Sequence, residues 1–245
     1  IRDSSTSRGL GDVYKRQKQP KAVDLPNYGV LECELEEEDI NNLWKLVHKY
    51  SPNAKWEGNR LLEISQDNKQ FPLNDDDQLF QNNVLMPATQ AYFDTYGVPF
   101  KHKTTHYHLP TFSRFWCRVS KDGDYQSIHD HQGIFTFVVW LKIPFEGEEE
   151  RMVQAGFRPE ASDFVLCYPD TCGQYQKRNW VLGKGAEGKM LFFPSDLNHI
   201  VYPHYTTTEY RIALAGDITI NSMMPTEPIN PDRSFEQMGS SGAVV

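Results

Sequence analysis

The chain has no hydrophobic stretch long enough to cross a membrane as a helix. Its longest apolar run, Ile134 to Leu141, covers about eight residues, whereas a membrane-spanning helix needs roughly 20. Cysteine is scarce as well, and the four cysteines form no C-x-x-C pair of the kind that a structural zinc site uses. These absences exclude a helical membrane protein and a cysteine-based zinc module, and we expect a soluble protein.

Cys167 and Cys172 are the two cysteines that lie close together in the sequence. No secretory signal precedes them, and most such cysteines are packed thiols rather than disulfides. We therefore expect free thiols and a cytoplasmic location.

Basic residues are outnumbered. The sequence has 25 Lys and Arg against 33 Asp and Glu, which gives a formal net charge of −8. Because nucleic-acid phosphates and anionic lipids attract positive surfaces, this balance makes nucleic acid an unlikely partner and gives no support to membrane binding. The sequence does not indicate an oligomeric state.

Length and composition favour one globular domain. The chain has 245 residues, 39% of them hydrophobic and 13% aromatic, enough for a sizeable core. Residues 1–18 lack apolar periodicity and read as an adapter-like, non-native segment, which we expect to be disordered. Residues 222–245 are rich in proline, serine and glycine and are also expected to be disordered. Residues 19–221 remain as a single domain.

Two helices are expected near the N-terminus. Acidic residues precede apolar positions between Ile40 and Val47, a pattern typical of an amphipathic helix whose N-terminus is stabilised by negative charge. A second helical pattern follows Asp77 and continues to Tyr96. Pro87 should break or kink it, and Gly97 should end it.

From Thr111 onward the pattern changes to short strands. Valine, isoleucine, threonine and aromatic residues fill runs that glycine, proline, aspartate or asparagine separate. The expected strands are Phe112 to Val119, Ile134 to Ile143, Phe164 to Tyr168, Asn179 to Leu182, Lys189 to Phe193, His199 to Tyr202 and Glu209 to Ile220. This order predicts a mainly β fold, a sandwich or jelly roll with N-terminal supporting helices. The long charged loop from Glu146 to Ser162 is a candidate lid.

The most informative motif is His129-Asp130-His131, which follows the polar turn at residues 121–124. Side chains on a strand alternate between its faces, so His129 and His131 would present two imidazoles to one metal ion. A third candidate ligand, His199, lies in a later strand-turn-strand pattern. The pattern suggests a redox iron site.

Arg211 stands twelve residues after His199, in the apolar run Tyr210 to Gly216. An arginine in such surroundings is costly to bury without an anion, and its planar fork suits a carboxylate. It therefore suggests an acidic cosubstrate. The alternative is an ordinary salt bridge, for example to Glu209.

Three segments carry a resemblance to a known family: GDYQSIHDHQGIFTFVVWLKIP, EGKMLFFPSDLNHIVYP and EYRIALAGDI. Together they resemble the 2-oxoglutarate/Fe(II) oxygenase superfamily, in particular a prolyl-hydroxylase-like group common in marine phages and bacteria. The resemblance covers about residues 112–220. It implies a double-stranded β-helix of the jelly-roll or cupin-like kind, and Fe(II), 2-oxoglutarate and O2 as cofactor and cosubstrates. It also implies the cytoplasm of a bacterial or phage-infected cell as the location.

The resemblance assigns His129 as the first iron ligand, His199 as the distal ligand and Arg211 as the residue that binds the remote carboxylate of 2-oxoglutarate. At position 131 this chain has histidine where the family usually has aspartate or glutamate. Three histidines form a reasonable site, since neutral imidazole binds Fe(II) well. The alternatives are that Asp130 turns inward through a β-bulge, or that no third protein ligand exists.

A second departure lies beside the arginine. The family often has serine or threonine two residues after it, where this chain has Ala213. Tyr202 and Tyr125 are candidates to supply the missing hydroxyl to the cosubstrate.

Other conspicuous residues have simpler interpretations. His106 and His108 precede the β core and are expected at the surface or in a substrate loop, and His204 is expected in a loop. Glu148 to Glu150 should be solvated. Trp116, Trp140 and Trp180 are expected in the core.

The sequence thus predicts an Fe(II)/2-oxoglutarate-dependent dioxygenase that hydroxylates a peptidyl, prolyl-like, or small-molecule C–H bond. Two other functions stay open. A cupin-type metal-dependent dioxygenase or isomerase would use the histidines but have no need of Arg211. A noncatalytic β-sandwich binding module would need neither.

Overall fold

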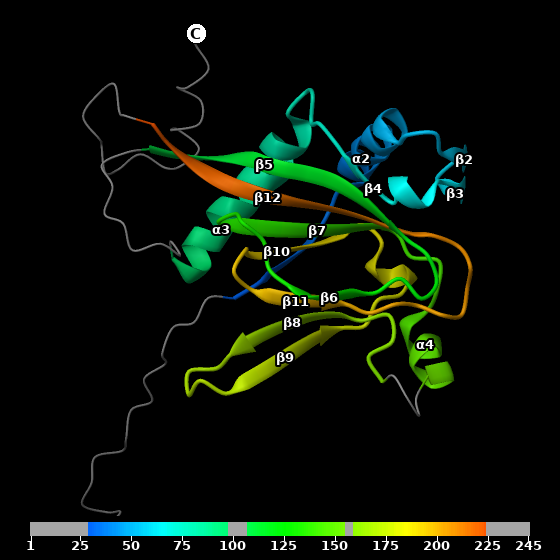
Figure 1. Ribbon diagram of the computed structural model, residues 1–245. Coiled ribbons are helices and arrows are strands. Elements are labelled where there is room, and N and C mark those ends of the chain that lie inside the picture. Colours follow the sequence, from blue (N-terminus) through cyan, green and yellow to red (C-terminus); the bar gives the residue numbers. More distant parts are fainter. Residues whose placement is uncertain (1–28, 98–106, 155–158, 224–245) are drawn as a thin grey trace, which may run out of the picture.

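Two antiparallel sheets face each other in the computed structural model, which describes residues 29–97, 107–154 and 159–223 (Figure 1). The large sheet has the strand order β1-β10-β7-β12-β5-β4 and the small sheet β6-β11-β8-β9. The large sheet consists of β1 (Leu31–Glu34), β4 (Gln70–Pro72), β5 (Tyr107–Ser120), β7 (Phe135–Lys142), β10 (Lys189–Pro194) and β12 (Arg211–Met223). The small sheet consists of β6 (Gln126–His129), β8 (Phe164–Pro169), β9 (Tyr175–Trp180) and β11 (Asn198–Val201). The predicted adapter-like segment lies outside the described residues.

The chain path through the sheets identifies the fold. From β5 to β12, the strands β5, β7, β10 and β12 belong to the large sheet, and β6, β8, β9 and β11 belong to the small one. The chain therefore passes repeatedly from one sheet to the other, which is the wrapping of a double-stranded β-helix or jelly roll. The fold class predicted from the sequence is confirmed.

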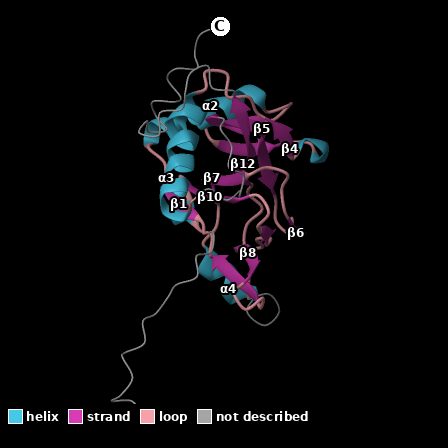
Figure 2. Ribbon diagram, turned by 90° about the vertical axis from the view of Figure 1, so that its left-hand side faces the viewer, coloured by secondary structure: helices cyan, strands magenta, loops and turns pink. Residues whose placement is uncertain are grey.

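Helices cover the outer face of the large sheet (Figure 2). Helix α2 (Glu37–Tyr50) begins with three acidic residues and buries Leu43, Trp44 and Val47, as its pattern predicted. Helix α3 (Met86–Tyr96) follows a π-helical turn over Gln81–Leu85, and Pro87 lies in its first turn. Since proline cannot donate a backbone hydrogen bond, the predicted irregularity occurs in the turn just before it. Gly97 ends the helix with φ 79°, a value that favours glycine.

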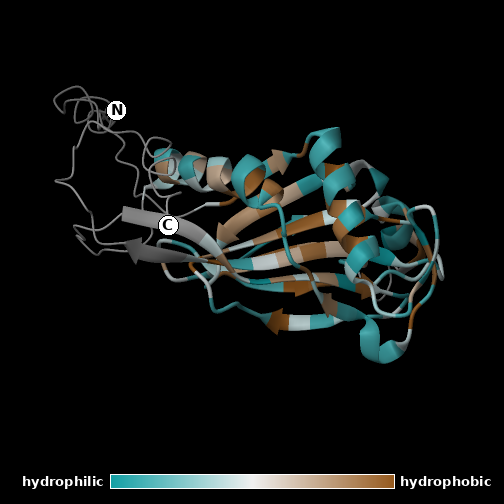
Figure 3. Ribbon diagram, turned by 90° about the horizontal axis from the view of Figure 1, so that it is seen from above, coloured by the Kyte–Doolittle hydropathy of each residue, from teal (hydrophilic) through white to brown (hydrophobic). Residues whose placement is uncertain are grey.

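The large sheet packs on both of its faces, because side chains alternate along its strands. Figure 3 colours the residues of these strands by hydropathy. On β7 and β12, Phe137, Val139, Ile212 and Leu214 pack in the core beneath the helices. Their neighbours in the sequence point instead towards the small sheet, where Trp140 joins a second core cluster. The second face, between the sheets, positions the candidate site.

Six of the seven predicted strands form close to the expected residues. The seventh was misplaced, because β9 covers Tyr175–Trp180 rather than Asn179 to Leu182. It pairs with β8 in a hairpin whose turn contains Gly173 at φ 77°. Its first four residues are exposed polar or aromatic side chains at the sheet edge, so the strand lacked an apolar signal.

The two ends of the β core also differ from the predictions. Strand β12 continues to Met223, two residues past the expected end of the domain, and residues 224–245 lie outside the described part. Strand β5 begins at Tyr107, so that His108 belongs to a strand, whereas His106 lies outside the described residues.

Smaller elements complete the structure. They are the hairpin β2 (Lys55–Glu57) and β3 (Arg60–Glu63), the 3-10 turns Gln66–Asn68 and Lys184–Ala186, and helix α4 (Gly147–Gln154). All four cysteines are free thiols, as expected. Among the described residues, no helix is both long and apolar enough to cross a membrane.

Glu150, which was expected to be solvated, and His204, which was expected in a loop, are both buried. The Glu150 carboxylate is fully buried in α4 and accepts hydrogen bonds from the backbone N–H groups of Tyr205 (2.7 Å) and Thr206 (2.9 Å). His204 lies in a loop as predicted, but it is fully buried and stacks on Phe145. The solvated-loop interpretation was therefore wrong for Glu150, which fixes the loop that leads into β12. Residues 155–158 of the candidate lid lie outside the described part of the chain, so the lid stays a prediction.

Replacing Glu150 with alanine should destabilise the protein, because it leaves the N–H groups of Tyr205 and Thr206 without their acceptor. We expect the free energy of unfolding to fall by about 1–3 kcal/mol for each donor that stays buried. Denaturant titration of Glu150→Ala measures this loss. The exposed neighbour provides a control, since Glu149→Ala should change stability by less than about 0.5 kcal/mol. Equal stability of the two variants would contradict the buried anchor.

Candidate metal centre

Three histidines meet between the two sheets. His129 is the last residue of β6 and pairs directly with His199 on β11. His131 lies two residues beyond the end of β6, so the expectation that one strand carries both His129 and His131 was only half correct. One ring nitrogen from each histidine lies within 4.8 Å of the others. The ring centroids are 4.2 Å apart for His129 and His199, and 5.0 Å for His131 and His199.

Each imidazole contacts an oxygen acceptor through its Nδ1 atom. Nδ1 of His129 lies 2.7 Å from the Ser127 carbonyl, and Nδ1 of His199 lies 3.2 Å from the Leu197 carbonyl. Nδ1 of His131 lies 2.5 Å from an oxygen of Asp217. These acceptors favour the tautomer with the proton on Nδ1, which leaves the Nε2 lone pair available to a metal. The three imidazoles therefore have the outer hydrogen bonds that metal-ligating histidines usually make.

The environment of His199 favours its metal-binding form. Burial, together with the electrostatic influence of His129, lowers the pKa of His199 to about 3. The ring is thus neutral at ordinary pH, as a metal ligand must be. Imidazole nitrogens are good ligands for Fe(II), as they are for Zn(II), Cu(II) and Ni(II).

Asp130, the alternative carboxylate ligand, is exposed and does not belong to the cluster of metal-ligand atoms. The register of β6 against β11 is irregular between Gln126 and His129, and Asp130 lies beyond this irregularity, outside the group of three histidines. Among the described residues, the geometry therefore favours the three-histidine set over the set with Asp130.

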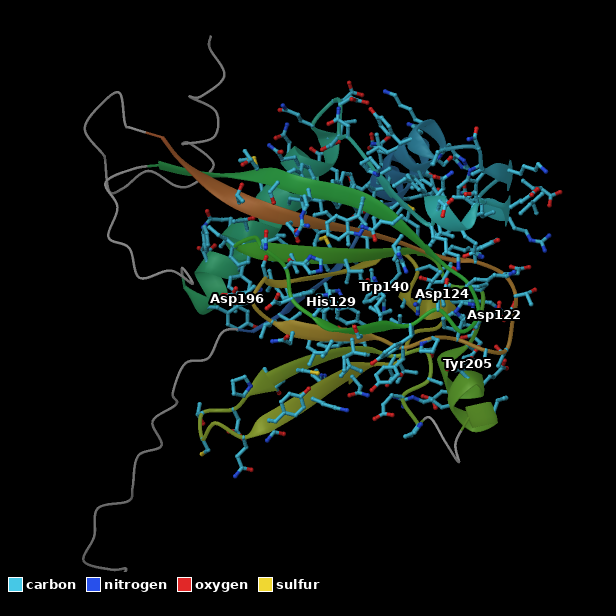
Figure 4. The ribbon with its side chains drawn as sticks, viewed as in Figure 1. Asp122, Asp124, His129, Trp140, Asp196 and Tyr205 are labelled. Carbon is cyan, nitrogen blue, oxygen red and sulfur yellow. The ribbon has the colours of Figure 1, made fainter. Side chains whose placement is uncertain are left out.

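The three histidines line a cavity between the sheets, and Figure 4 shows His129 and Trp140 in this region. The large sheet contributes residues of β5, β7 and β12, and the small sheet contributes residues of β6, β8 and β11. Phe164, Phe193 and Trp140 form apolar parts of the wall. Such a wall limits the access of water to the histidines.

Arg211 reaches the same cavity from β12 and is almost completely buried, with 2% of its surface exposed. Its guanidinium donates a hydrogen bond to the Tyr202 carbonyl (3.2 Å), and no carboxylate of the described residues lies within ion-pair distance. Glu209, the salt-bridge partner that the alternative interpretation named, pairs with Arg60 instead. Burial lowers the pKa of Arg211 to about 10, so it remains charged near neutral pH. A buried cation without a partner anion is what an anion-binding role requires.

Strand β5 brings two polar residues to the cavity that sequence reasoning missed. Ser120 is the cross-strand partner of Arg211, and Arg118 is the partner of Ala213; both side chains line the cavity. The Nε atom of Arg118 is buried without a hydrogen-bond partner. Alternation along β5 was the available signal, because Trp116, Arg118 and Ser120 share one strand face.

The two tyrosines predicted to assist Arg211 lie differently. Tyr202 contacts Arg211 through its backbone carbonyl, and its ring is 5.8 Å from the ring of Tyr125. Neither side chain is among the residues that line the cavity, and Tyr125 is 52% exposed. Ser120, which is the direct cross-strand partner of Arg211 and lines the same cavity, is therefore a better candidate for this hydroxyl than either tyrosine.

Asp217 is the other residue that the sequence interpretation missed. It lies on β12 with no exposed side-chain surface and contacts His131 and Arg114. Burial alone would raise the pKa of Asp217, but the hydrogen bonds from His131 and Arg114 hold it below the usual value. A buried carboxylate that remains charged therefore lies directly behind one of the three histidines.

Replacing any of the three histidines should weaken metal binding. Anaerobic titration with Co(II), followed by absorption spectroscopy, should show one site in the wild-type protein. In His129→Ala, His131→Ala or His199→Ala, the affinity should fall more than the roughly 10- to 100-fold typical of outer-shell changes. Asp130→Ala is the matched control and should bind Co(II) as the wild type does. A loss in Asp130→Ala with retention in His131→Ala would reverse the ligand assignment.

Comparison with known proteins adds a family match. Residues 114–217 match the family model described as putative 2OG-Fe(II) oxygenase, and this segment contains all three histidines, Arg211 and Asp217. The search of curated proteins found no similar sequence.

Several solved structures are similar at low identity. A Burkholderia pseudomallei oxidoreductase of the 2OG-Fe(II) oxygenase family has 11% identity and a TM-score of 0.47, covering 78% of this chain and 85% of the other. A Pseudomonas putida prolyl-4-hydroxylase has 12% identity and a TM-score of 0.44, with coverages of 78% and 92%. A Trichoplax adhaerens prolyl hydroxylase, in complex with a hypoxia inducible factor peptide fragment, has 11% identity and a TM-score of 0.42, with coverages of 78% and 84%.

Proposed function

We propose that this chain, whose residues 114–217 match the model of the putative 2OG-Fe(II) oxygenase family, hydroxylates a C–H bond of a peptide or small molecule by means of the three-histidine site. His129, His131 and His199 would hold Fe(II), and Arg211 would bind the remote carboxylate of 2-oxoglutarate. The observation that carries this proposal is the shared cavity. It brings three available Nε2 atoms together with a buried arginine that has no carboxylate partner among the described residues.

The three histidines would hold the metal, and Arg211 would orient the cosubstrate. Fe(II) together with 2-oxoglutarate and O2 supplies oxidation of a substrate C–H bond, coupled to decarboxylation of 2-oxoglutarate to succinate and CO2. Three histidines would hold Fe(II) through only part of its coordination sphere and would leave room for the cosubstrate and O2. Arg211 would fix the far end of the cosubstrate through two parallel hydrogen bonds. Phe164, Phe193 and Trp140 would keep bulk water away from the reacting atoms.

A larger cleft of about 790 Å³ begins beside the histidines and offers a place for the substrate. Its lining includes Leu166, the cross-strand partner of His199, and Leu197, whose carbonyl contacts the His199 ring. Trp180 and Arg178 of the edge strand β9 form another part of it. Clefts of this size accommodate small organic ligands or a short peptide segment.

The proposal predicts turnover that depends on both the metal and the cosubstrate. Purified protein would be titrated anaerobically with Fe(II) and 2-oxoglutarate, then exposed to O2 and assayed for succinate. We expect a charge-transfer absorption band before O2 is added, and succinate afterwards. Succinate in the absence of added substrate would come from uncoupled decarboxylation, which still reports cosubstrate use.

The two other functions give different results in the same experiment. Metal binding without any charge-transfer band or succinate would favour a cupin-type enzyme that does not use 2-oxoglutarate. Failure to bind Fe(II) at all would favour a noncatalytic binding module. Either result would overturn the proposal.

Arg211→Met should reduce the affinity for 2-oxoglutarate by at least about 30-fold, because loss of one partner of a buried charge pair typically costs about 2–5 kcal/mol. The affinity for Co(II) alone should stay near the wild-type value, since Arg211 is not one of the clustered ligands. Anaerobic titration with 2-oxoglutarate in the presence of the metal measures the change. Arg60→Met is the control, because Arg60 is half-exposed and does not line the cavity. Unchanged affinity in Arg211→Met would remove Arg211 from this role.

A further inference from the structure

Asp217 lies at the centre of a row of side chains that crosses three strands of the large sheet. On β12 it pairs directly with Arg114 of β5 on one side and with Thr136 of β7 on the other. Its side chain has no exposed surface. Burial of a carboxylate costs free energy unless hydrogen bonds and an opposite charge compensate it. The contacts of Asp217 therefore indicate what its burial is for.

The two carboxylate oxygens of Asp217 have different partners. Oδ2 accepts hydrogen bonds from Arg114, with Nε at 2.8 Å and the terminal nitrogen at 2.6 Å. Oδ1 lies 2.5 Å from Nδ1 of His131 and accepts a hydrogen bond from the Thr136 hydroxyl at 3.1 Å. The half-exposed Arg114 therefore balances the charge from outside the site, while the other oxygen is directed at the imidazole.

His131 differs from the other two histidines in the nature of its acceptor. His129 and His199 contact neutral backbone carbonyls, whereas His131 contacts a carboxylate. A carboxylate behind a ligating imidazole fixes its tautomer and makes its free nitrogen a stronger donor. Among the described residues of the cluster, His131 alone receives this negative charge.

The remaining surroundings hold the His131 ring in one orientation. Its backbone N–H donates to the Ser195 carbonyl at 3.0 Å, and its ring stacks on Trp116 with centroids 5.4 Å apart. The Ser195 hydroxyl is 2.9 Å from the Thr136 hydroxyl, which in turn contacts Asp217. The ring is thus fixed by its backbone, by one face and by its Nδ1 atom.

We propose that Asp217 is the positioning residue of the metal site, because it holds the ring of His131 with Nε2 directed towards the metal. Asp217 also places a negative charge behind this ring, which matters because residue 131 is a neutral donor in this chain and not a carboxylate. The inference rests on the proposed metal site and goes beyond it, because Asp217 is not one of the three ligands. Relatives usually have a carboxylate at position 131 as a metal ligand. In this chain the carboxylate of Asp217 on β12 would instead lie behind the imidazole of His131, which would separate it from the metal.

The first test needs no metal. Nitrogen-15 NMR of the metal-free wild-type protein should show His131 protonated on Nδ1 and unprotonated on Nε2. Asp217→Asn should shift the His131 signals, because an amide can present its N–H₂ group to Nδ1 and reverse the tautomer. The wild-type protein with the proton on Nε2 of His131 would overturn the proposal, and this measurement does not depend on how well any variant folds.

The second test is the affinity for Co(II) alone. Asp217→Asn should weaken Co(II) binding by about 10- to 100-fold, as outer-shell changes typically do. Arg114→Gln is the matched control, because it removes the other partner of the same carboxylate and leaves the contact with His131 in place. Arg114→Gln should lose thermal stability while keeping its Co(II) affinity within about threefold of the wild type.

The outcomes separate a positioning role from a structural one. If Asp217→Asn and Arg114→Gln lose Co(II) affinity in parallel with their loss of stability, Asp217 acts only in the fold and the inference fails. Wild-type affinity in Asp217→Asn also contradicts it. These failures differ from failure of the proposed function, in which the wild-type protein itself would not bind the metal.

Discussion

The pairing of β12 between β5 and β7 is the interaction on which the rest of the site depends. Through this pairing, alternate residues of one strand point either into the core beneath the helices or into the cavity. Ile212 and Leu214 belong to the core beneath the helices, whereas Arg211 lines the cavity and Asp217 contacts His131, one of the lining residues. Burial of apolar surface stabilises a fold by roughly 25 cal/mol per Å², whereas holding two charged residues on the buried opposite face costs free energy.

Much of this arrangement follows from local sequence pattern. The strands were predictable where apolar and β-branched residues alternate or run together, as in β7, and the distant pairing of His129 with His199 followed from the family resemblance. Strand β9 was misplaced because its exposed, largely polar residues give no periodic signal. Glu150 was interpreted as solvated because an acidic run usually is, and only the tertiary structure brings two backbone N–H groups to it.

The outer parts of the site were less predictable than its ligands. A histidine pair can be recognised from its spacing, since two residues define it. Asp217 contacts His131 across 86 positions of sequence, and Ser120 approaches Arg211 only through the register of β5 against β12. Such contacts depend on the pairing of strands that are far apart in the sequence, and local residue patterns do not show which strands pair. Residues that tune a site are therefore harder to foresee than residues that form it.

The register of β12 determines the orientation of both charged side chains in the proposed chemistry, those of Asp217 and Arg211. Asp217 and Arg211 are six residues apart on β12, an even separation, so both point into the space between the sheets. A slip of one residue would turn both away together. At Ser113, β5 has one residue more than β12, and its hydroxyl donates to the Asp217 carbonyl at 3.1 Å. That irregularity lies at Asp217, which contacts His131. One strand therefore carries both the negative charge behind a proposed metal ligand and the positive charge that would bind the cosubstrate.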